Sequence, residues 1–402
     1  MSASISLGRI FGIPIRLHIT FLLIFPLFVY IFSDPPNQNE IFGIVLSFKD
    51  LGVATWVKYV FGTIASVLFF MAILGHELAH SYLAQKYGVK IRHITLMIFG
   101  GVSAMEETPR NPGQEWRMAF AGPLSSLAIG AVSFLAMIVL EFAGTNSVLS
   151  DGVSILLGIT GFYNVLLAAF NLIPAFPMDG GRLLRSYFAT RMPYVDATRY
   201  AAKIGRYFAI GMGLFGLITF NFFFIIIALF VYIGATEEEQ ATAITESLQG
   251  LTVRQLMTHD VQVVHPETTI QQLHELMLAT RHMGFPVVDR GLVGIVTLTD
   301  THKVPKEQLP HARVKDIMTR EVVTVSPDVD AAKALHLMTE KRISRLVVLE
   351  NGLLAGIISQ KDFLRAINIM AAKGRGAQWS YSYTLQPPQG PTPPPSPPTA
   401  SS

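Results

Sequence analysis

The chain has 402 residues, of which 50% are hydrophobic and 15% are charged. About a quarter of the residues of a typical soluble domain are charged, so this composition excludes an ordinary soluble protein and indicates an integral membrane protein. Cysteine is absent, which excludes disulfides, thiolate zinc ligands and a cysteine nucleophile. The net charge of +3 does not require nucleic acid, because many Lys and Arg residues lie in short loops beside apolar runs. We therefore expect no nucleic-acid partner.

Six apolar runs come near the ~20 residues that a helix needs to cross hydrocarbon. The predicted spans are residues 17–32, 56–84, 118–142, 155–173, 204–218 and 222–234. The last two are short and could form a tight hairpin. No small-residue cleavage site follows the first run, so we expect it to be a retained span.

The second predicted span carries residues with an evident chemical use. Residues 76–80 read His-Glu-Leu-Ala-His, and residues 60–75 before them contain no charged side chain. Positions i and i+4 share one face of a helix, so His76 and His80 can bind one tetrahedral Zn²⁺. Glu77 can then act as general base in peptide hydrolysis. A chance match is the alternative, but three ionisable side chains in an apolar span are costly without a partner.

Residues 94–104 are apolar, too short to cross a membrane, and contain paired glycines. This pattern predicts a short hairpin or re-entrant strand at membrane depth, where irregular backbone must be covered by protein or line a wet cavity. The edge of such a strand could pair with an extended peptide substrate. The segment could equally serve as a structural cap.

Two histidines leave a zinc ion one protein ligand short. Lys86 stands where a metzincin would place its third histidine, and Glu106 or Glu107 is the early candidate for a thermolysin-like arrangement. Asp179 is the better candidate, because it follows the fourth predicted span in a segment broken by Pro and Gly, where a carboxylate can face inward.

Residues 171–180 read Asn-Leu-Ile-Pro-Ala-Phe-Pro-Met-Asp-Gly. Together with residues 76–80, this segment resembles the site-2 proteases, which are intramembrane zinc metalloproteases with the motifs H-E-x-x-H and N-x-x-P-x-x-x-x-D-G. The resemblance also covers Phe99-Gly100-Gly101 and Ala121-Gly122-Pro123-Leu124, and so nearly all of the membrane half.

The resemblance implies roles for five residues. His76, His80 and Asp179 would be the zinc ligands, and Glu77 would be the general base. Asn171 would hold the substrate backbone or the tetrahedral oxyanion, whose developing charge a hydrogen-bond donor stabilises. The other interpretation of Asn171 is a cap at the C-terminus of the fourth span.

Positive charges favour one orientation in the membrane. If the N-terminus is cytoplasmic, most loop Lys and Arg residues fall in cytoplasmic connections, whereas the opposite loops carry Lys49 and Lys58. An even number of spans then places both termini in the cytoplasm. We expect a multi-pass protein of a prokaryotic cell membrane, with its zinc site nearer the cytoplasmic face.

The second half of the chain is a repeat. Residues 253–258 (Val-Arg-Gln-Leu-Met-Thr) recur as Val-Lys-Asp-Ile-Met-Thr at 314–319, and residues 294–300 recur at 356–362. Strand-like runs alternate with amphipathic helices in each copy, which predicts a duplicated α/β module.

The module resembles a tandem pair of cystathionine-β-synthase (CBS) domains, which commonly bind adenosine nucleotides. The resemblance implies that Thr297 with Asp300, and Ser359 with Asp362, contact an adenosyl ligand such as ATP or AMP. In each pair the Asp would accept hydrogen bonds from ribose and the hydroxyl would lie near phosphate. Alternatively, the module serves mainly for dimerisation, since Asp also caps helices well. We expect a homodimer formed through it.

The expected fold is therefore a polytopic α-helical membrane domain, with a short membrane-associated β hairpin, followed by a cytosolic α/β tandem CBS domain. The predicted boundaries are 1–235 for the protease domain, 236–250 for a polar linker, 251–305 and 311–370 for the CBS domains, and 371–402 for a Pro-rich disordered tail.

These features predict intramembrane proteolysis: zinc-dependent hydrolysis of a peptide bond in a transmembrane helix of a substrate protein, near the cytoplasmic face. The expected partners are the lipid bilayer, that substrate and a regulatory adenine nucleotide. The alternative is a CBS-regulated metal-ion transporter or channel. A transport site would not need Glu77 beside His76, nor a third ligand from a broken span.

Overall fold

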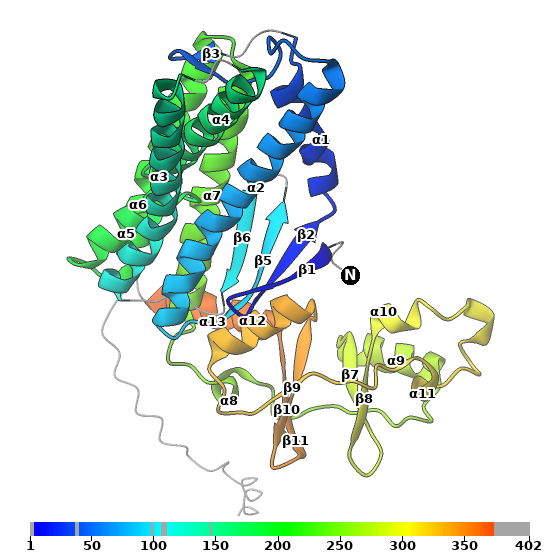
Figure 1. Ribbon diagram of the computed structural model, residues 1–402. Coiled ribbons are helices and arrows are strands. Elements are labelled where there is room, and N and C mark those ends of the chain that lie inside the picture. Colours follow the sequence, from blue (N-terminus) through cyan, green and yellow to red (C-terminus); the bar gives the residue numbers. More distant parts are fainter. Residues whose placement is uncertain (1–3, 37–39, 98–99, 106–110, 145–146, 374–402) are drawn as a thin grey trace, which may run out of the picture. The chain divides into compact units, whose positions relative to one another are not determined.

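The computed structural model describes residues 4–36, 40–97, 100–105, 111–144 and 147–373. The chain divides into two compact units, residues 1–243 and 244–402 (Figure 1). Phe99, Glu106, Glu107 and nearly all of the predicted tail lie outside the described residues.

Among the described residues, four helices of the first unit are long and apolar enough to cross a membrane. They are α2 (Thr55–Lys86), α3 (Pro112–Phe142), α4 (Val148–Asn171) and α6 (Tyr194–Ile218). Their outer faces expose large apolar side chains, such as Leu135 of α3 and Leu217 of α6, which suits contact with hydrocarbon. The protein is a multi-pass membrane protein.

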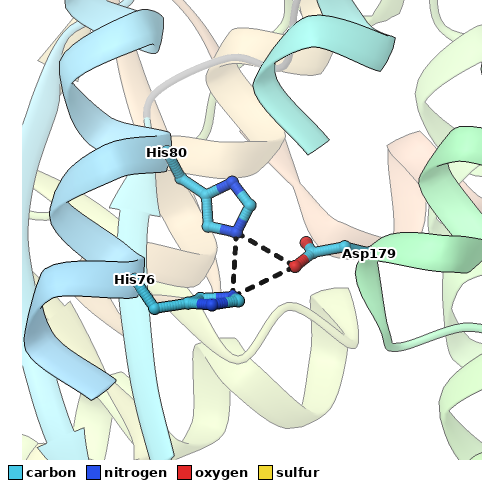
Figure 2. A group of neighbouring side chains, drawn as sticks. All are labelled: His76, His80 and Asp179. Carbon is cyan, nitrogen blue, oxygen red and sulfur yellow. Dashed lines mark hydrogen bonds and ion pairs between the residues drawn. The ribbon is translucent and has the colours of Figure 1, made fainter. Parts of the chain in front are cut away.

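The other two predicted spans stay predictions. Helix α1 (Phe21–Ser33) has 13 residues, and α7 (Phe222–Ser247) has 26 but turns acidic from Glu237 onward. Because α7 continues to Ser247, most of the predicted polar linker is helical. Between α4 and α6, the short helix α5 (Asp179–Ala189) begins beside α2 (Figure 2).

A four-stranded sheet packs against α2. It contains β1 (Ser4–Ile10), β2 (Ile13–His18), β5 (Ile91–Met97) and β6 (Gly100–Met105), in the order β1-β2-β5-β6. Strands β5 and β6 pair antiparallel at the predicted hairpin, while β2 pairs parallel with β5. The start of the first predicted span therefore lies in β2. A separate short hairpin joins β3 (Glu40–Ile41) to β4 (Ile44–Val45). The location of the sheet relative to a bilayer stays a prediction.

The apolar face of the four-stranded sheet packs against the middle and the C-terminal part of α2 and positions them. Ile15 and Ile94 from the sheet pack with Phe70 and Ile73 of α2 in one buried cluster. Residue 76 follows within one helical turn, so this contact also sets the position of the histidine motif relative to β6.

The second unit contains the predicted repeat. The first copy comprises α8 (Val253–Leu256), α9 (Ile270–Thr280), β7 (Gly284–Val288), β8 (Leu292–Thr297), α10 (Leu298–Thr301) and a 3-10 helix (Lys306–Gln308). The second comprises α11 (Val314–Ile317), β9 (Thr324–Val325), α12 (Ala331–Lys341), β10 (Arg345–Glu350), β11 (Leu353–Ser359) and α13 (Gln360–Lys373).

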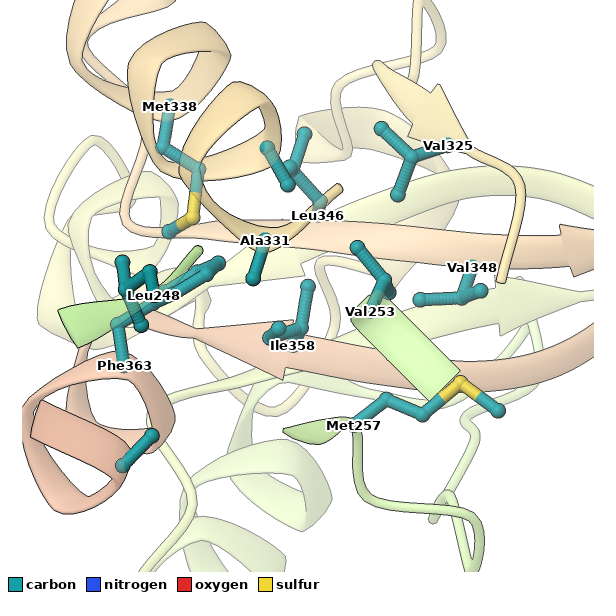
Figure 3. Close-up of a cluster of buried hydrophobic side chains, with 12 residues drawn as sticks. Leu248, Val253, Met257, Val325, Ala331, Met338, Leu346, Val348, Ile358 and Phe363 are labelled. Carbon is teal, nitrogen blue, oxygen red and sulfur yellow. The ribbon is translucent and has the colours of Figure 1, made fainter. Parts of the chain in front are cut away.

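The two copies exchange their opening helices. Val253, from α8 of the first copy, is buried against Leu346 and Ile358 of the second copy (Figure 3). Conversely, Val314 of α11 is buried with Phe285 in the core of the first copy. The copies thus follow one another in sequence but interlock in space.

Candidate metal centre

Three side chains from two helices converge at one point. His76 and His80 project from α2, and Asp179 is the first residue of α5 (Figure 2). Asp179 Oδ2 lies 3.2 Å from His76 Nε2 and 3.0 Å from His80 Nε2, and the two nitrogens are 3.2 Å apart. All three side chains are buried, with exposed fractions of 3%, 6% and 8% for His76, His80 and Asp179.

This triangle has the dimensions of a zinc site. A tetrahedral zinc ion with ligands at about 2.0–2.1 Å requires its donor atoms to be separated by roughly 3.3 Å. In the part of the chain that the structure describes, these residues form the one cluster of three His, Asp or Glu side chains that could hold a metal ion. The predicted ligands therefore fit zinc in number, type and spacing.

The outward nitrogens of both histidines are held by α3. His80 Nδ1 lies 2.6 Å from the backbone oxygen of Met118, and His76 Nδ1 lies 2.9 Å from Ser126 Oγ. A carbonyl can only accept a hydrogen bond, so His80 must carry its proton on Nδ1 and direct the lone pair of Nε2 inward. Such outer partners orient a metal ligand and raise its basicity.

Gly122 explains how α3 can pass so close to the metal centre. A Cβ atom at this position would overlap with the His80 ring and lie 2.6 Å from His76 Nε2. The missing side chain leaves the space that an ion between the two rings requires. This is the physical reason for glycine in the Ala-Gly-Pro-Leu segment.

Two glycines place Asp179 at the centre. After α4 ends at Asn171, the chain turns back on itself before α5 begins. A Cβ on Gly180 would overlap with the backbone of Ile173, and one on Gly181 would lie 2.6 Å from the nitrogen of Phe176. The tight turn therefore requires glycine directly after the aspartate.

Glu77 lies between the metal centre and the sheet. Its Oε2 atom accepts a hydrogen bond of 2.7 Å from Ser103 Oγ on β6. A Cβ on Gly101 would overlap with the Glu77 side chain, so the strand contacts it closely. Sequence analysis missed Ser103, because the glycine pair beside it predicts a turn but does not indicate which side chain faces α2.

Asn171 is oriented along its own helix. Its Nδ2 atom donates a hydrogen bond of 2.9 Å to the backbone oxygen of Leu167, one turn earlier in α4. Asn164 makes the same i to i−4 bond to Thr160 in the middle of α4, so the bond does not decide between the two interpretations of Asn171, and both stay predictions.

The predicted nucleotide-binding residues form two equivalent caps. Thr297 donates to Asp300 Oδ2 from its backbone nitrogen (3.0 Å) and its Oγ1 (2.7 Å). Ser359 does the same to Asp362 Oδ2 at 2.8 and 2.6 Å. Burial acts to raise the pKa of Asp300, but hydrogen bonds from Thr297 and Lys303 outweigh it and hold the pKa below its ordinary value. The structure keeps both pairs intact, while their contact with a ligand stays a prediction.

Arg345 is a further candidate that the sequence analysis did not identify. It begins β10, directly opposite Ser359, and its Nη1 atom is buried without a hydrogen-bond partner among the described residues. Its guanidinium occupies the space beside Gly284, which begins the equivalent strand of the first copy and pairs with Thr297. Burial lowers the pKa of Arg345. A buried guanidinium nitrogen without a hydrogen-bond partner among the described residues therefore lies beside the strand ends that carry Ser359 and Thr297.

Comparisons with known proteins match a different family to each of the two units. Residues 64–154 and 138–212 match Peptidase family M50, and residues 253–304 and 314–369 match the CBS domain. The chain is 37% identical over 374 residues to zinc metalloprotease MJ0392 of Methanocaldococcus jannaschii, with 93% of this chain and 98% of that protein covered. It is 29% identical to stage IV sporulation protein FB of Bacillus subtilis, over 36% of this chain and 46% of that protein.

Among solved structures, the chain is similar to the site-2 protease from Methanocaldococcus jannaschii. The sequence identity is 40%, with 59% of this chain and 95% of that chain covered and a TM-score of 0.40. The extent of the match to MJ0392, together with the metal centre, decides the family. The chain belongs to peptidase family M50, the site-2 protease family of zinc metalloproteases, and carries a pair of CBS domains after its protease part.

Proposed function

We propose that this zinc metalloprotease hydrolyses a peptide bond within a transmembrane helix of another protein, near the cytoplasmic face of a prokaryotic membrane. The observation that carries the proposal is the buried triangle of His76, His80 and Asp179, placed on helices of a multi-pass membrane unit. The alternative of a metal-ion transporter is not favoured, because the chain belongs to a family of proteases.

The residues around the triangle divide the catalytic work. When bound, zinc supplies a Lewis acid for the scissile carbonyl and for the attacking water. Met118 and Ser126 keep the two histidine rings oriented with Nε2 inward. Glu77, one position from His76, takes a proton from the attacking water and delivers it to the leaving amine nitrogen. Asn171 is proposed to stabilise the oxyanion after a side-chain rotation away from Leu167.

Strand β6 is suited to hold the substrate. It is an edge strand of its sheet, and its residues Gly101 and Ser103 contact Glu77. A transmembrane helix satisfies its backbone hydrogen bonds internally, so cleavage requires local unwinding. Pairing of the unwound segment with β6 would replace the lost backbone hydrogen bonds beside the general base.

The proposed function includes regulation by an adenine nucleotide such as ATP or AMP. The support is Nη1 of Arg345, which has no hydrogen-bond partner within the described part of the chain. It lies beside the strand ends that carry Thr297 and Ser359 and is suited to a phosphate group. Asp300 and Asp362 would accept hydrogen bonds from the ribose hydroxyls. A homodimer formed through the CBS pair, with both termini cytoplasmic, completes the proposal.

The decisive experiment measures cleavage of a purified single-span substrate by the detergent-solubilised protein. Glu77→Gln should lower the rate by about 10²–10⁴-fold, the usual contribution of a general base, while zinc remains bound. Glu141→Gln, the same change at an exposed position of α3, is the control and should leave the rate unchanged. Equal cleavage by wild type and Glu77→Gln, or zinc flux into liposomes without cleavage, would contradict the proposal.

A further inference from the structure

Arg185 is a charged residue buried in the first unit, on the same short helix as Asp179. Only 2% of its surface is exposed, and Glu115, its partner on α3, is buried to the same degree. Arg185 Nε and Nη2 lie 2.8 and 2.6 Å from Glu115 Oε1, and Nη1 lies 2.5 Å from Glu238 Oε1 on α7. We call these three residues the Arg185 cluster.

The Arg185 cluster is connected to both sides of Asp179. Arg185 lies later on the same helix, and its guanidinium also stacks on the ring of Phe176, at 5.0 Å, in the turn that precedes Asp179. The guanidinium also lies over the ring of Tyr194 at 4.9 Å, and Tyr194 in turn donates to Glu115 Oε1 at 3.4 Å. The segment that carries the metal-binding carboxylate is therefore held before and after that residue.

The cluster also uses the face of α3 that holds the histidines. Glu115, Met118, Gly122 and Ser126 are buried and spaced three or four residues apart, so they lie along one stripe of the helix. Met118 and Ser126 hold the rings of the histidines, and Gly122 leaves room beside them. Glu115, at the start of the stripe, holds α5 through Arg185. One face of α3 thus contacts both histidines directly and α5 through Arg185, so it positions all three proposed ligands relative to one another.

A gain in folding stability does not by itself explain the buried ion pair of Arg185 and Glu115. Replacing a buried ion pair with packed apolar side chains is often neutral or stabilising, because desolvation offsets the attraction. Here the arrangement also leaves Glu115 Oε2 buried without a hydrogen bond among the described residues. The directional contacts of a guanidinium can, however, fix the relative position of three helices.

We propose that Arg185 is a positioning residue that holds Asp179 at the metal centre, and that Glu238 makes this hold depend on α7. The inference rests on the metal site of the proposed function. Glu238 is the accessible member, with 34% of its side chain exposed, and the neighbouring Glu239 pairs with Arg206 of α6. The acidic segment of α7 therefore holds both α5 and α6, and α7 is the helix whose chain continues into residues 244–402.

The test uses the full-length protein loaded with Co²⁺, whose visible absorption reports the geometry of its ligands. Arg185→Lys keeps the charge but loses the fork that contacts Glu115 and Glu238 together. It should lower Co²⁺ affinity by about 10–100-fold, as loss of an outer partner does, and should alter the absorption bands. Glu238→Gln should produce the same spectral change with a smaller loss of affinity. Arg117→Lys and Glu237→Gln, at exposed positions on α3 and α7, are matched controls that should leave both readouts unchanged.

Two results would overturn the inference. One is a folded Arg185→Lys protein with the affinity and spectrum of wild type. The other is a Glu238→Gln protein with the affinity and spectrum of wild type. This variant decides alone if Arg185→Lys does not fold, because the Glu238 side chain is partly exposed and its loss leaves the pair of Arg185 and Glu115 in place. Failure of the wild-type protein to bind Co²⁺ would instead reject the metal site, so the two failures are distinguishable.

Discussion

The metal centre in the first unit and the Thr/Ser-x-x-Asp pairs in the second unit differ in how their polar atoms are satisfied. His76, His80 and Asp179 are buried and direct ring nitrogens and a carboxylate oxygen toward one another. Such an arrangement is costly in an apolar helix bundle unless a cation is bound. By contrast, Thr297 and Asp300 satisfy one another as an ordinary helix cap. The cost of burial therefore indicates that the first site binds a cation. In the second unit the same polar atoms are satisfied by a helix cap, so their geometry alone does not indicate a ligand.

The largest effect should come from filling the space beside the histidines. Gly122→Ala should abolish zinc binding, with a loss greater than the roughly 100-fold that removal of an outer partner causes, because the new Cβ overlaps with the His80 ring. Zinc content after dialysis and isothermal titration measure the effect. Gly211→Ala on α6 is the control, since a Cβ there meets no atom within 4 Å. Normal zinc content in the Gly122 variant would remove the metal site from this position.

A smaller effect should follow from changing the orientation of one ring. Ser126→Ala removes the partner of His76 Nδ1 and should weaken zinc binding by about 10–100-fold without unfolding the protein. Competition with a chromophoric chelator gives the affinity. Ser133→Ala, at another buried serine of α3, should behave as wild type. Identical affinity in both variants would mean that α3 packs against the histidine without orienting it.

The second unit can be tested for nucleotide binding beside the two Thr/Ser-x-x-Asp caps. Arg345→Met should reduce ATP or AMP binding at least ~10-fold, because the positive charge and the contact proposed between Nη1 and a phosphate are lost. Titration calorimetry of the full-length protein measures it, with Arg290→Met at an exposed turn as control. The absence of heat with either nucleotide in wild type would favour dimerisation as the main role of the CBS pair.

The smallest effect is the pH dependence of one cap. The folded-state pKa of Asp300 lies below its unfolded value, so its cap stabilises the folded state above the unfolded pKa of about 3.9 and is lost as pH falls through the folded pKa. The melting temperature of Asp300→Asn should therefore lie below that of wild type near pH 6, and the gap should narrow below about pH 4. Asp260→Asn, at an exposed position, should show no such gap. A constant gap at all pH values would contradict a stabilising carboxylate.

Much of the metal centre could be predicted from local sequence. The i, i+4 spacing of His76 and His80 places both on one face of any helix, and the segment around Asp179 matched the family motif. The fold was less complete. Sequence analysis predicted the β5–β6 hairpin but not β1 and β2, because the N-terminal strands are too short and too close to an apolar run to be distinguished from its flank.

The sequence by itself determined the apolar helices, the histidine pair and the repeat, because each depends on spacings within a few residues or on direct self-similarity. Only the tertiary structure decided which groups surround the proposed ligands: Met118 and Ser126 behind the rings, Gly122 beside them, and Arg185 between Glu115 and Glu238. It also decided the exchange of α8 and α11 between the two CBS copies. These contacts join segments far apart in the chain, and which atoms meet depends on how the packed helices are rotated and offset, which no local pattern encodes.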